Sequence, residues 1–97
     1  MNNMKHNIIV KFIEDYDYKN HLDEIKNLFN LALNVEGIIE IKYHVSSTTL
    51  PNRGDLWIEI ICSEKGADNW KNCSSHITWI NQYSKFVKTK MIFDCLE

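Results

Sequence analysis

Apolar and polar residues alternate along four segments of the chain, and an alternation with a period of two predicts β-strands. Polar or turn-forming residues separate these segments, among them an acidic run after the first one and a long polar loop over residues 46–54. We therefore predict four strands, at residues 5–13, 38–45, 55–62 and 88–96.

The alternation gives each predicted strand two different faces. The faces expected to point toward a core carry His6, Ile8, Val10 and Phe12 in the first strand, Ile39, Ile41, Tyr43 and Val45 in the second, and Leu56, Ile58, Ile60 and Cys62 in the third. The opposite faces carry Lys5, Asn7, Ile9, Lys11 and Ile13, then Glu40, Lys42 and His44, then Trp57, Glu59 and Ile61. Both faces of the third strand are largely apolar, which indicates that neither is left in contact with water.

Between the strands, the spacing of apolar residues changes to that of helices. Residues 18–35 carry apolar side chains at intervals of three and four, and Gly37 follows where a C-cap glycine is common. Ser63 is suited to cap a short helix that ends near residue 72, and a further helix follows Ser75. The apolar stripe of the first helix consists of Leu22, Ile25, Leu28, Phe29, Ala32 and Val35, and the last helix carries His76, Trp79, Ile80, Tyr83 and Phe86.

The order strand, helix, strand, strand, helices, strand, with antiparallel pairing, is the ferredoxin-like α+β arrangement. Its four-stranded sheet has helices on one face only, so the other face would expose apolar side chains. Large exposed apolar patches are uncommon on proteins that act as monomers. We therefore expect a homodimer in which two copies pack sheet to sheet. The expected contact residues are Ile9, Ile13, Trp57 and Ile61.

Composition and charge narrow the range of functions. The 97 residues form one domain, 1–97, and 44% apolar with 25% charged residues is ordinary for a folded protein. The net charge of −2, with the basic residues scattered, gives no reason to expect nucleic acid as a partner. The apolar runs are too short to cross a membrane and no apolar leader is present, so we expect a cytoplasmic protein without a membrane partner. The 3 cysteines match no zinc or redox spacing, so we expect reduced thiols, no metal and no cofactor.

Four short segments of the chain stand in the order and spacing of a known family. They are Lys5-His6-x-Ile8-x-Val10-Lys11-Phe12, the turn Glu36-Gly37-Ile38, the stretch from Trp70 to His76, and Ile92-Phe93-Asp94. Together they resemble the stress-responsive A/B barrel, or Dabb, family of dimeric α+β barrels, and the resemblance covers nearly the whole chain. The resemblance implies the ferredoxin-like fold and its assembly as a dimeric α/β barrel, whereas most members of the family have no assigned chemistry.

The resemblance also implies candidate catalytic residues. In plant polyketide cyclases of this family, a histidine on the second helical segment and a tyrosine six residues before it promote an aldol closure without a cofactor. His76 stands at that histidine, Trp70 stands at that tyrosine, and His6 matches a pocket histidine on the first strand. His76 and His6 are therefore the catalytic candidates. An indole N–H donates a hydrogen bond but cannot accept a proton or titrate like a phenol, so half of the acid–base pair is missing.

A ligand between sheet and helices would meet an apolar wall, and each candidate also has a purely structural interpretation. His76 is suited to tie a loop to the sheet by a hydrogen bond, and His6 to be a core histidine with satisfied polar atoms. Tryptophans at core spacing are commonly part of the core. The expected contacts to a small apolar or aromatic ligand are Trp70, Ile8, Trp79 and Phe29.

Three functions remain open on the sequence. The first is a small-molecule-binding barrel with cofactor-independent lyase or cyclase chemistry in a cavity between sheet and helices. The second is a non-enzymatic, stress-related or regulatory dimeric module with structural histidines. The third is a cofactor-independent monooxygenase on the same fold. The presence of a cavity beside the histidines distinguishes the first from the second.

Overall fold

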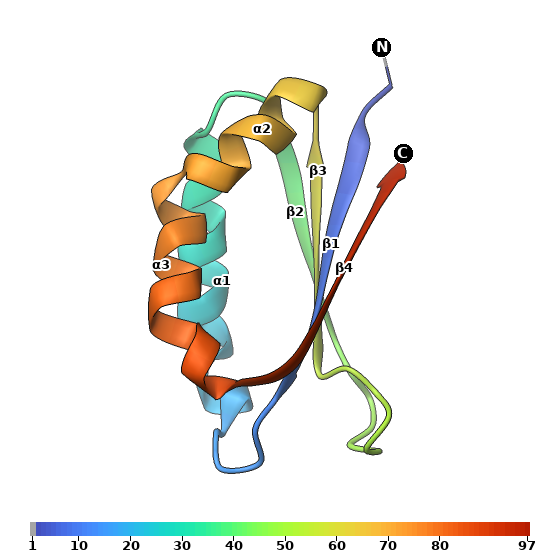
Figure 1. The fold of residues 1–97 in the computed structure, drawn as a ribbon, viewed down its shortest axis with the longest axis vertical. Helices are drawn as coiled ribbons and strands as arrows, with labels where there is room; N and C mark the ends of the chain where they lie inside the picture. Colours follow the sequence, from blue (N-terminus) through green and yellow to red (C-terminus); the bar gives the residue numbers. More distant parts are fainter. Residues whose placement is uncertain (1) are drawn as a thin grey trace.

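A computed structural model describes residues 2–97 as a four-stranded antiparallel sheet with three α-helices on one of its faces (Figure 1). The strand order is β2-β3-β1-β4, so β1 and β3 are central, and the predicted ferredoxin-like arrangement is confirmed. None of the helices within residues 2–97 is long and apolar enough to span a membrane. The elements, in chain order, are β1 (Met4–Phe12), η1 (Tyr18–His21), α1 (Leu22–Asn30), η2 (Leu31–Asn34), β2 (Ile38–Val45), β3 (Leu56–Cys62), α2 (Glu64–Asn72), α3 (Ser74–Tyr83), η3 (Ser84–Phe86) and β4 (Val87–Leu96).

The first helical segment is confirmed in position, but it is divided into three parts. Only α1 is α-helical, and the 3₁₀ turns η1 and η2 extend it at both ends. The predicted stripe is the buried one, because Ile25, Phe29 and Ala32 are fully buried against the sheet. The spacing of the apolar residues therefore predicted which side of this segment faces the core.

Two glycines let α2 pack directly on the start of β2. Gly37 has a φ of +91°, in the region that favours glycine. A Cβ on Gly37 would collide with the backbone of Gly66, and a Cβ on Gly66 would collide with the backbone of Gly37. The hydroxyl of Ser63 accepts a hydrogen bond from the N–H of Gly66 and caps α2 as predicted. This close approach places Trp70, in the last turn of α2, against the end of the sheet.

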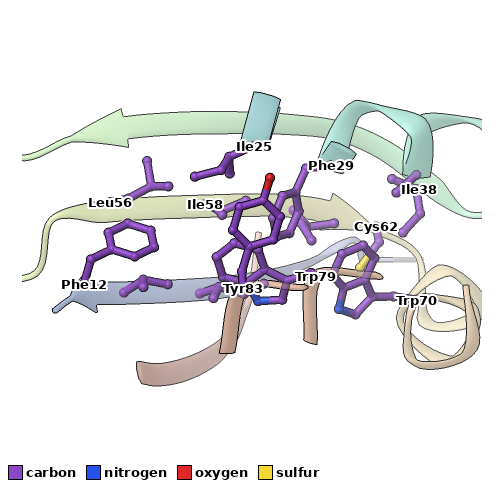
Figure 2. Close-up of a cluster of buried hydrophobic side chains, with 14 residues drawn as sticks. Phe12, Ile25, Phe29, Ile38, Leu56, Ile58, Cys62, Trp70, Trp79 and Tyr83 are labelled. Carbon is purple, nitrogen blue, oxygen red and sulfur yellow. The ribbon is translucent and has the colours of Figure 1, made fainter. Parts of the chain in front are cut away.

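The hydrophobic core fills the space between the helices and the covered face of the sheet (Figure 2). On the helix side, Trp79 packs edge-on against Phe29 and stacks with Tyr83, each pair with ring centroids 5.1 Å apart. On the sheet side, the inward residues of β3 are at most 1% exposed; they are Leu56, Ile58, Ile60 and Cys62. The predicted inward face of the third strand is therefore confirmed.

The predicted faces of the second strand are wrong at its first residues. A β-bulge lies between Ile38 and Glu40, so that Ile38 pairs with Cys62 and Glu40 pairs with Ile61. As a result, Ile38 is buried and Ile39 is 52% exposed. The bulge adds one residue to the strand. A prediction from strict alternation assumes no extra residue and therefore assigns the residues before the bulge to the wrong face.

The helix-free face exposes a set of apolar residues that matches the predicted one only in part. Ile9 lies on this face, opposite Trp57, and is half-buried. Ile61 is only 3% exposed and is already covered within the chain, and Ile13 lies beyond the end of β1. Trp57 is exposed on this face as predicted. Met91 and Phe93 of β4 are the unpredicted members, and the register of β4 with β1 places both on the same face. The apolar surface of this face therefore reaches the edge strand.

Candidate functional site

His6 faces the helix-covered side of the sheet, and the register of β1 with β4 puts Asp94 directly beside it. Nδ1 of His6 lies 2.5 Å from Oδ1 of Asp94. The imidazole is 22% exposed, and the carboxylate is 56% exposed. A carboxylate at Nδ1 holds the N–H on that nitrogen and leaves Nε2 with its lone pair, which is the tautomer that a general base needs.

A pocket of about 190 Å³ opens beside this pair, bounded by α2 and by the neighbouring ends of β1 and β4. His6 and Asp94 line it from the strands, and Trp70 lines it from α2. The other lining residues are Met4, Lys5, Cys62, Glu64, Ala67, Asp68 and Lys71. Pockets for drug-sized ligands have volumes of roughly 300–1,000 Å³. This pocket is therefore suited to a smaller molecule, such as one with a single ring.

Trp70 forms the inner wall of the pocket and separates the two candidate histidines. Its ring centroid is 6.4 Å from that of His6 and 5.1 Å from that of His76. In Figure 2, Trp70 lies at the α2 end of the core, next to Cys62. Both histidines are thus on the helix-covered side of the sheet, as predicted, with the indole between them.

His76 connects the two consecutive helices. Its Nδ1 donates a hydrogen bond of 3.0 Å to the backbone carbonyl of Lys71, in the last turn of α2. This bond holds the imidazole against Trp70, and His76 is not among the residues that line the 190 Å³ pocket. The geometry gives His76 a structural contact, and its catalytic role stays a prediction.

The other three predicted ligand contacts lie behind Trp70. Ile8, Phe29 and Trp79 are at most 2% exposed and belong to the core cluster. None of them lines the 190 Å³ pocket. Their contact with a ligand stays a prediction.

The pocket is lined by charged side chains of both signs and by apolar side chains. Burial raises the pKa of the Cys62 thiol, and the negative charge of Asp94 raises it further. Cys62 is therefore a neutral, weakly polar part of the wall rather than a thiolate nucleophile. Within residues 2–97, no three His, Cys, Asp or Glu side chains are grouped closely enough to hold a metal ion.

Asp94 lines this pocket, and the sequence analysis did not identify it as functional. It lies 88 positions from His6 and becomes its neighbour only through the pairing of β1 with β4. The ferredoxin-like order of elements predicts that the first and last strands pair. It leaves the register open, and the register decides that His6 faces Asp94.

The fold and the pocket define a ferredoxin-like α+β protein with a small, partly charged cavity at one end of the sheet. No family model matches the chain, and no curated protein matches its sequence. The similarity to known proteins is therefore found at the level of the fold, in solved structures.

Three of these solved structures superpose over nearly the whole chain. A dimeric ferredoxin-like protein of unknown function from Thermobifida fusca matches with a TM-score of 0.82 at 5% identity, over 99% of this chain and 92% of that chain. A Dabb family protein with a ferredoxin-like fold from Mesorhizobium loti matches with a TM-score of 0.75 at 5% identity, over 100% and 98%. A hydroxynitrile lyase from Passiflora edulis matches with a TM-score of 0.77 at 10% identity, over 98% and 93%. The chain therefore has the fold of a Dabb family protein, and the resemblance found in the sequence is confirmed at the level of the fold.

Proposed function

We propose that this protein binds a small apolar or aromatic ligand in the pocket beside Trp70, and that His6 takes a proton from the ligand without a cofactor. The observation that carries the proposal is the His6–Asp94 pair at the pocket, with 2.5 Å between Nδ1 and Oδ1. Asp94 orients the imidazole and stabilises the imidazolium that forms when Nε2 accepts a proton. Trp70 supplies a flat apolar wall for the ligand.

A lyase reaction suits one base with one orienting carboxylate. In the cleavage of a hydroxynitrile, Nε2 of His6 removes the hydroxyl proton, the C–CN bond breaks, and a carbonyl group forms as the electron pair leaves with cyanide. The imidazolium then gives its proton to cyanide, which returns His6 to its starting form. Lys71, which lines the same pocket, supplies positive charge for the departing anion. The shared fold with the hydroxynitrile lyase from Passiflora edulis makes a hydroxynitrile the first substrate to test.

The test is the turnover of mandelonitrile, a single-ring hydroxynitrile, followed by the release of benzaldehyde. We expect the wild-type protein to be active and His6→Gln to lose about 10²–10⁴-fold in rate, because a positioned base is removed. His21→Gln is the matched control, since it removes another histidine that is paired with a carboxylate, Glu24 at 3.1 Å, and does not line this pocket. Equal rates for the wild type and His6→Gln would exclude His6 as the base.

Ligand binding is measured separately from turnover. Native mass spectrometry of protein purified from its own cells identifies a retained small molecule, and the tryptophan fluorescence, to which Trp70 beside the pocket contributes, reports its binding. Binding that is lost when the pocket is filled by Ala67→Leu would support this pocket as the site. A wild-type protein that carries no ligand and turns over no hydroxynitrile would contradict the proposal.

We also propose that two copies of the chain assemble through the helix-free faces of their sheets, in the cytoplasm. The exposed apolar side chains on this face, Trp57, Met91 and Phe93, support the assembly. The structure from Thermobifida fusca is described as dimeric and shares the fold.

A non-enzymatic dimeric module is the second candidate, and the position of His76 favours it. The Nδ1 of His76 is engaged by the carbonyl of Lys71, and the space between Ile8 and Trp79 is closely packed. Absence of both binding and turnover in the experiments above, with an intact dimer, is the result that this candidate predicts.

A further inference from the structure

A chain of polar contacts crosses the helix-free face of the sheet, on the side opposite the covered core. Glu59 of β3 is at its centre, and its side chain is only 5% exposed although no helix covers this face. Oε2 of Glu59 lies 3.2 Å from Nζ of Lys5 on β1, and Oε1 lies 3.1 Å from Nε2 of His44 on β2. The carboxylate is therefore held between donors from both neighbouring strands.

The same contacts fix the orientation of Trp57. The ring of His44 stacks on the indole with centroids 4.1 Å apart and planes 28° from parallel. Nε1 of Trp57 donates a 2.7 Å hydrogen bond to Oδ1 of Asn7, whose Nδ2 donates a 2.9 Å bond to the carbonyl of Phe93. The contacts thus run from β2 to β4 across all four strands, and they hold a large, exposed apolar side chain in one position.

Glu59 is ionised in this network. Burial raises its pKa, but hydrogen bonds from His44 and Lys5 and the charges of Lys5 and Lys42 outweigh burial, so the pKa lies below the ordinary 4.5. Within the described residues, 2–97, no buried side-chain nitrogen or oxygen lacks a hydrogen-bond partner. A partner that covers this face therefore meets a polar network whose buried groups are already satisfied.

The shape of the face suits a second copy of the same face. Trp57, Met91 and Phe93 project from it, and they are 39%, 63% and 59% exposed. Two hollows lie on the same side of the sheet. One of about 230 Å³ adjoins His44 and Trp57, and one of about 300 Å³ adjoins Met91 and residues 51–54. A surface that carries both projections and hollows can pair with itself about a two-fold axis.

We infer that Glu59 makes this self-pairing tight, because its carboxylate compensates the two donors, Lys5 and His44, that a second copy covers. This inference rests on the dimer proposed above. The side chains of Lys5 and His44 are still 33% and 44% exposed in one chain, so a second copy removes water from both. With the Glu59 carboxylate in place, the Lys5 ammonium enters the interface as one half of an ion pair. Without it, the ammonium is buried with no opposite charge, which is strongly unfavourable.

The test compares two single substitutions in two Lys–Glu pairs. Glu59→Gln keeps the size of the side chain and an acceptor for His44 but removes the charge opposite Lys5. Glu36→Gln is the matched control, since Glu36 pairs with Lys65 at 3.0 Å with both side chains well exposed. We expect Glu59→Gln to raise the dimer dissociation constant at least about 30-fold, and Glu36→Gln to leave it within about 2-fold, because a pair desolvated at an interface loses far more than a solvated one. Sedimentation from nanomolar to micromolar concentration measures both constants.

Each outcome separates the inference from the dimer itself. If the wild-type protein is monomeric at every concentration in the sedimentation series, both the proposed dimer and this inference are wrong. If the wild type is a dimer and Glu59→Gln has the same dissociation constant as Glu36→Gln, the inference is wrong but the dimer stands. If Glu59→Gln fails to fold, as seen by circular dichroism, the reversed pair Lys5→Glu/Glu59→Lys carries the test. A folded reversed pair that dimerises more tightly than Lys5→Glu alone supports the inference, and one that does not overturns it.

Discussion

Nδ1 of His6, on β1, lies 2.5 Å from Oδ1 of Asp94, on β4, although these two strands lie at opposite ends of the chain. In the proposed mechanism Asp94 orients the imidazole of His6, so we expect Asp94→Asn to lower kcat for hydroxynitrile cleavage by about 10²-fold with little change in KM. Groups that act as a unit are not additive, so the double variant His6→Gln/Asp94→Asn should lose no more activity than His6→Gln alone. Steady-state kinetics of the three variants measure this, and additive losses would show that the two residues act separately.

Trp70 leads to an expectation about substrate range. The wild-type protein should bind a linear tetraketide thioester weakly and should not cyclise it, because the indole offers only an N–H where the plant cyclases have a phenol. The loss of a positioned acid or base costs about 10²–10⁴ in rate. Product analysis of the wild type and Trp70→Tyr, with tryptophan fluorescence as the record of binding, gives the answer.

Cyclisation by the unmodified protein would contradict this expectation and would require another tyrosine. The hydroxyls of Tyr83 and Tyr43 already donate hydrogen bonds to Glu24 and Asn30, and neither residue lines the pocket beside Trp70. Both tyrosines would have to give up these bonds to take part.

Trp57 gives the most direct test of the dimer. Trp57→Asp places a charge where apolar surface is covered, and the loss of an interface tryptophan commonly costs at least about 2 kcal/mol, or about 30-fold in affinity. Ile77→Asp is the control, because Ile77 is also exposed, at 49%, but lies on α3 away from the sheet. Sedimentation should give about twice the 11.5 kDa chain mass for the wild type and for Ile77→Asp, and a lower mass for Trp57→Asp. Equal masses for the two variants would place the interface elsewhere.

Tyr43 links stability to high pH. Its single hydroxyl proton is shared between Oδ1 of Asn30, at 2.7 Å, and the carbonyl oxygen of Lys26, at 3.1 Å. Burial raises the pKa of Tyr43 from 10.0 to about 12. A group whose pKa is raised by folding stabilises the fold fully below its unfolded value and loses that contribution as the pH rises through the folded value. We expect Tyr43→Phe to lower the free energy of unfolding by about 1 kcal/mol at neutral pH.

The difference between the wild type and Tyr43→Phe should shrink as the pH rises from 10.0 toward 12, because only the wild type loses this contribution. Urea unfolding of both proteins at equal concentration, over a series of pH values, measures the difference. A difference that stays constant over this range would show that Tyr43 titrates as it does in the unfolded chain.

Several features of this protein follow from residues that are close together in the chain. The apolar stripe of α1, with Ile25 and Phe29 buried, follows from a spacing of three and four. The inward face of β3 follows from strict alternation, and the cap at Ser63 follows from the chemistry of one hydroxyl and a nearby N–H. These are local signals, and each is contained within one helical segment, one strand or one helix cap.

The features that carry the site and the proposed interface depend on strand register. The bulge that buries Ile38 and exposes Ile39, the meeting of His6 with Asp94, and the enclosure of Glu59 by donors from β1 and β2 all arise where strands from different parts of the chain pair. A shift of one residue in any of these pairings would turn the side chains to the other face of the sheet. Periodicity within a strand tells which residues share a face, whereas the residue across from each of them is set by the packing of the whole sheet against its helices.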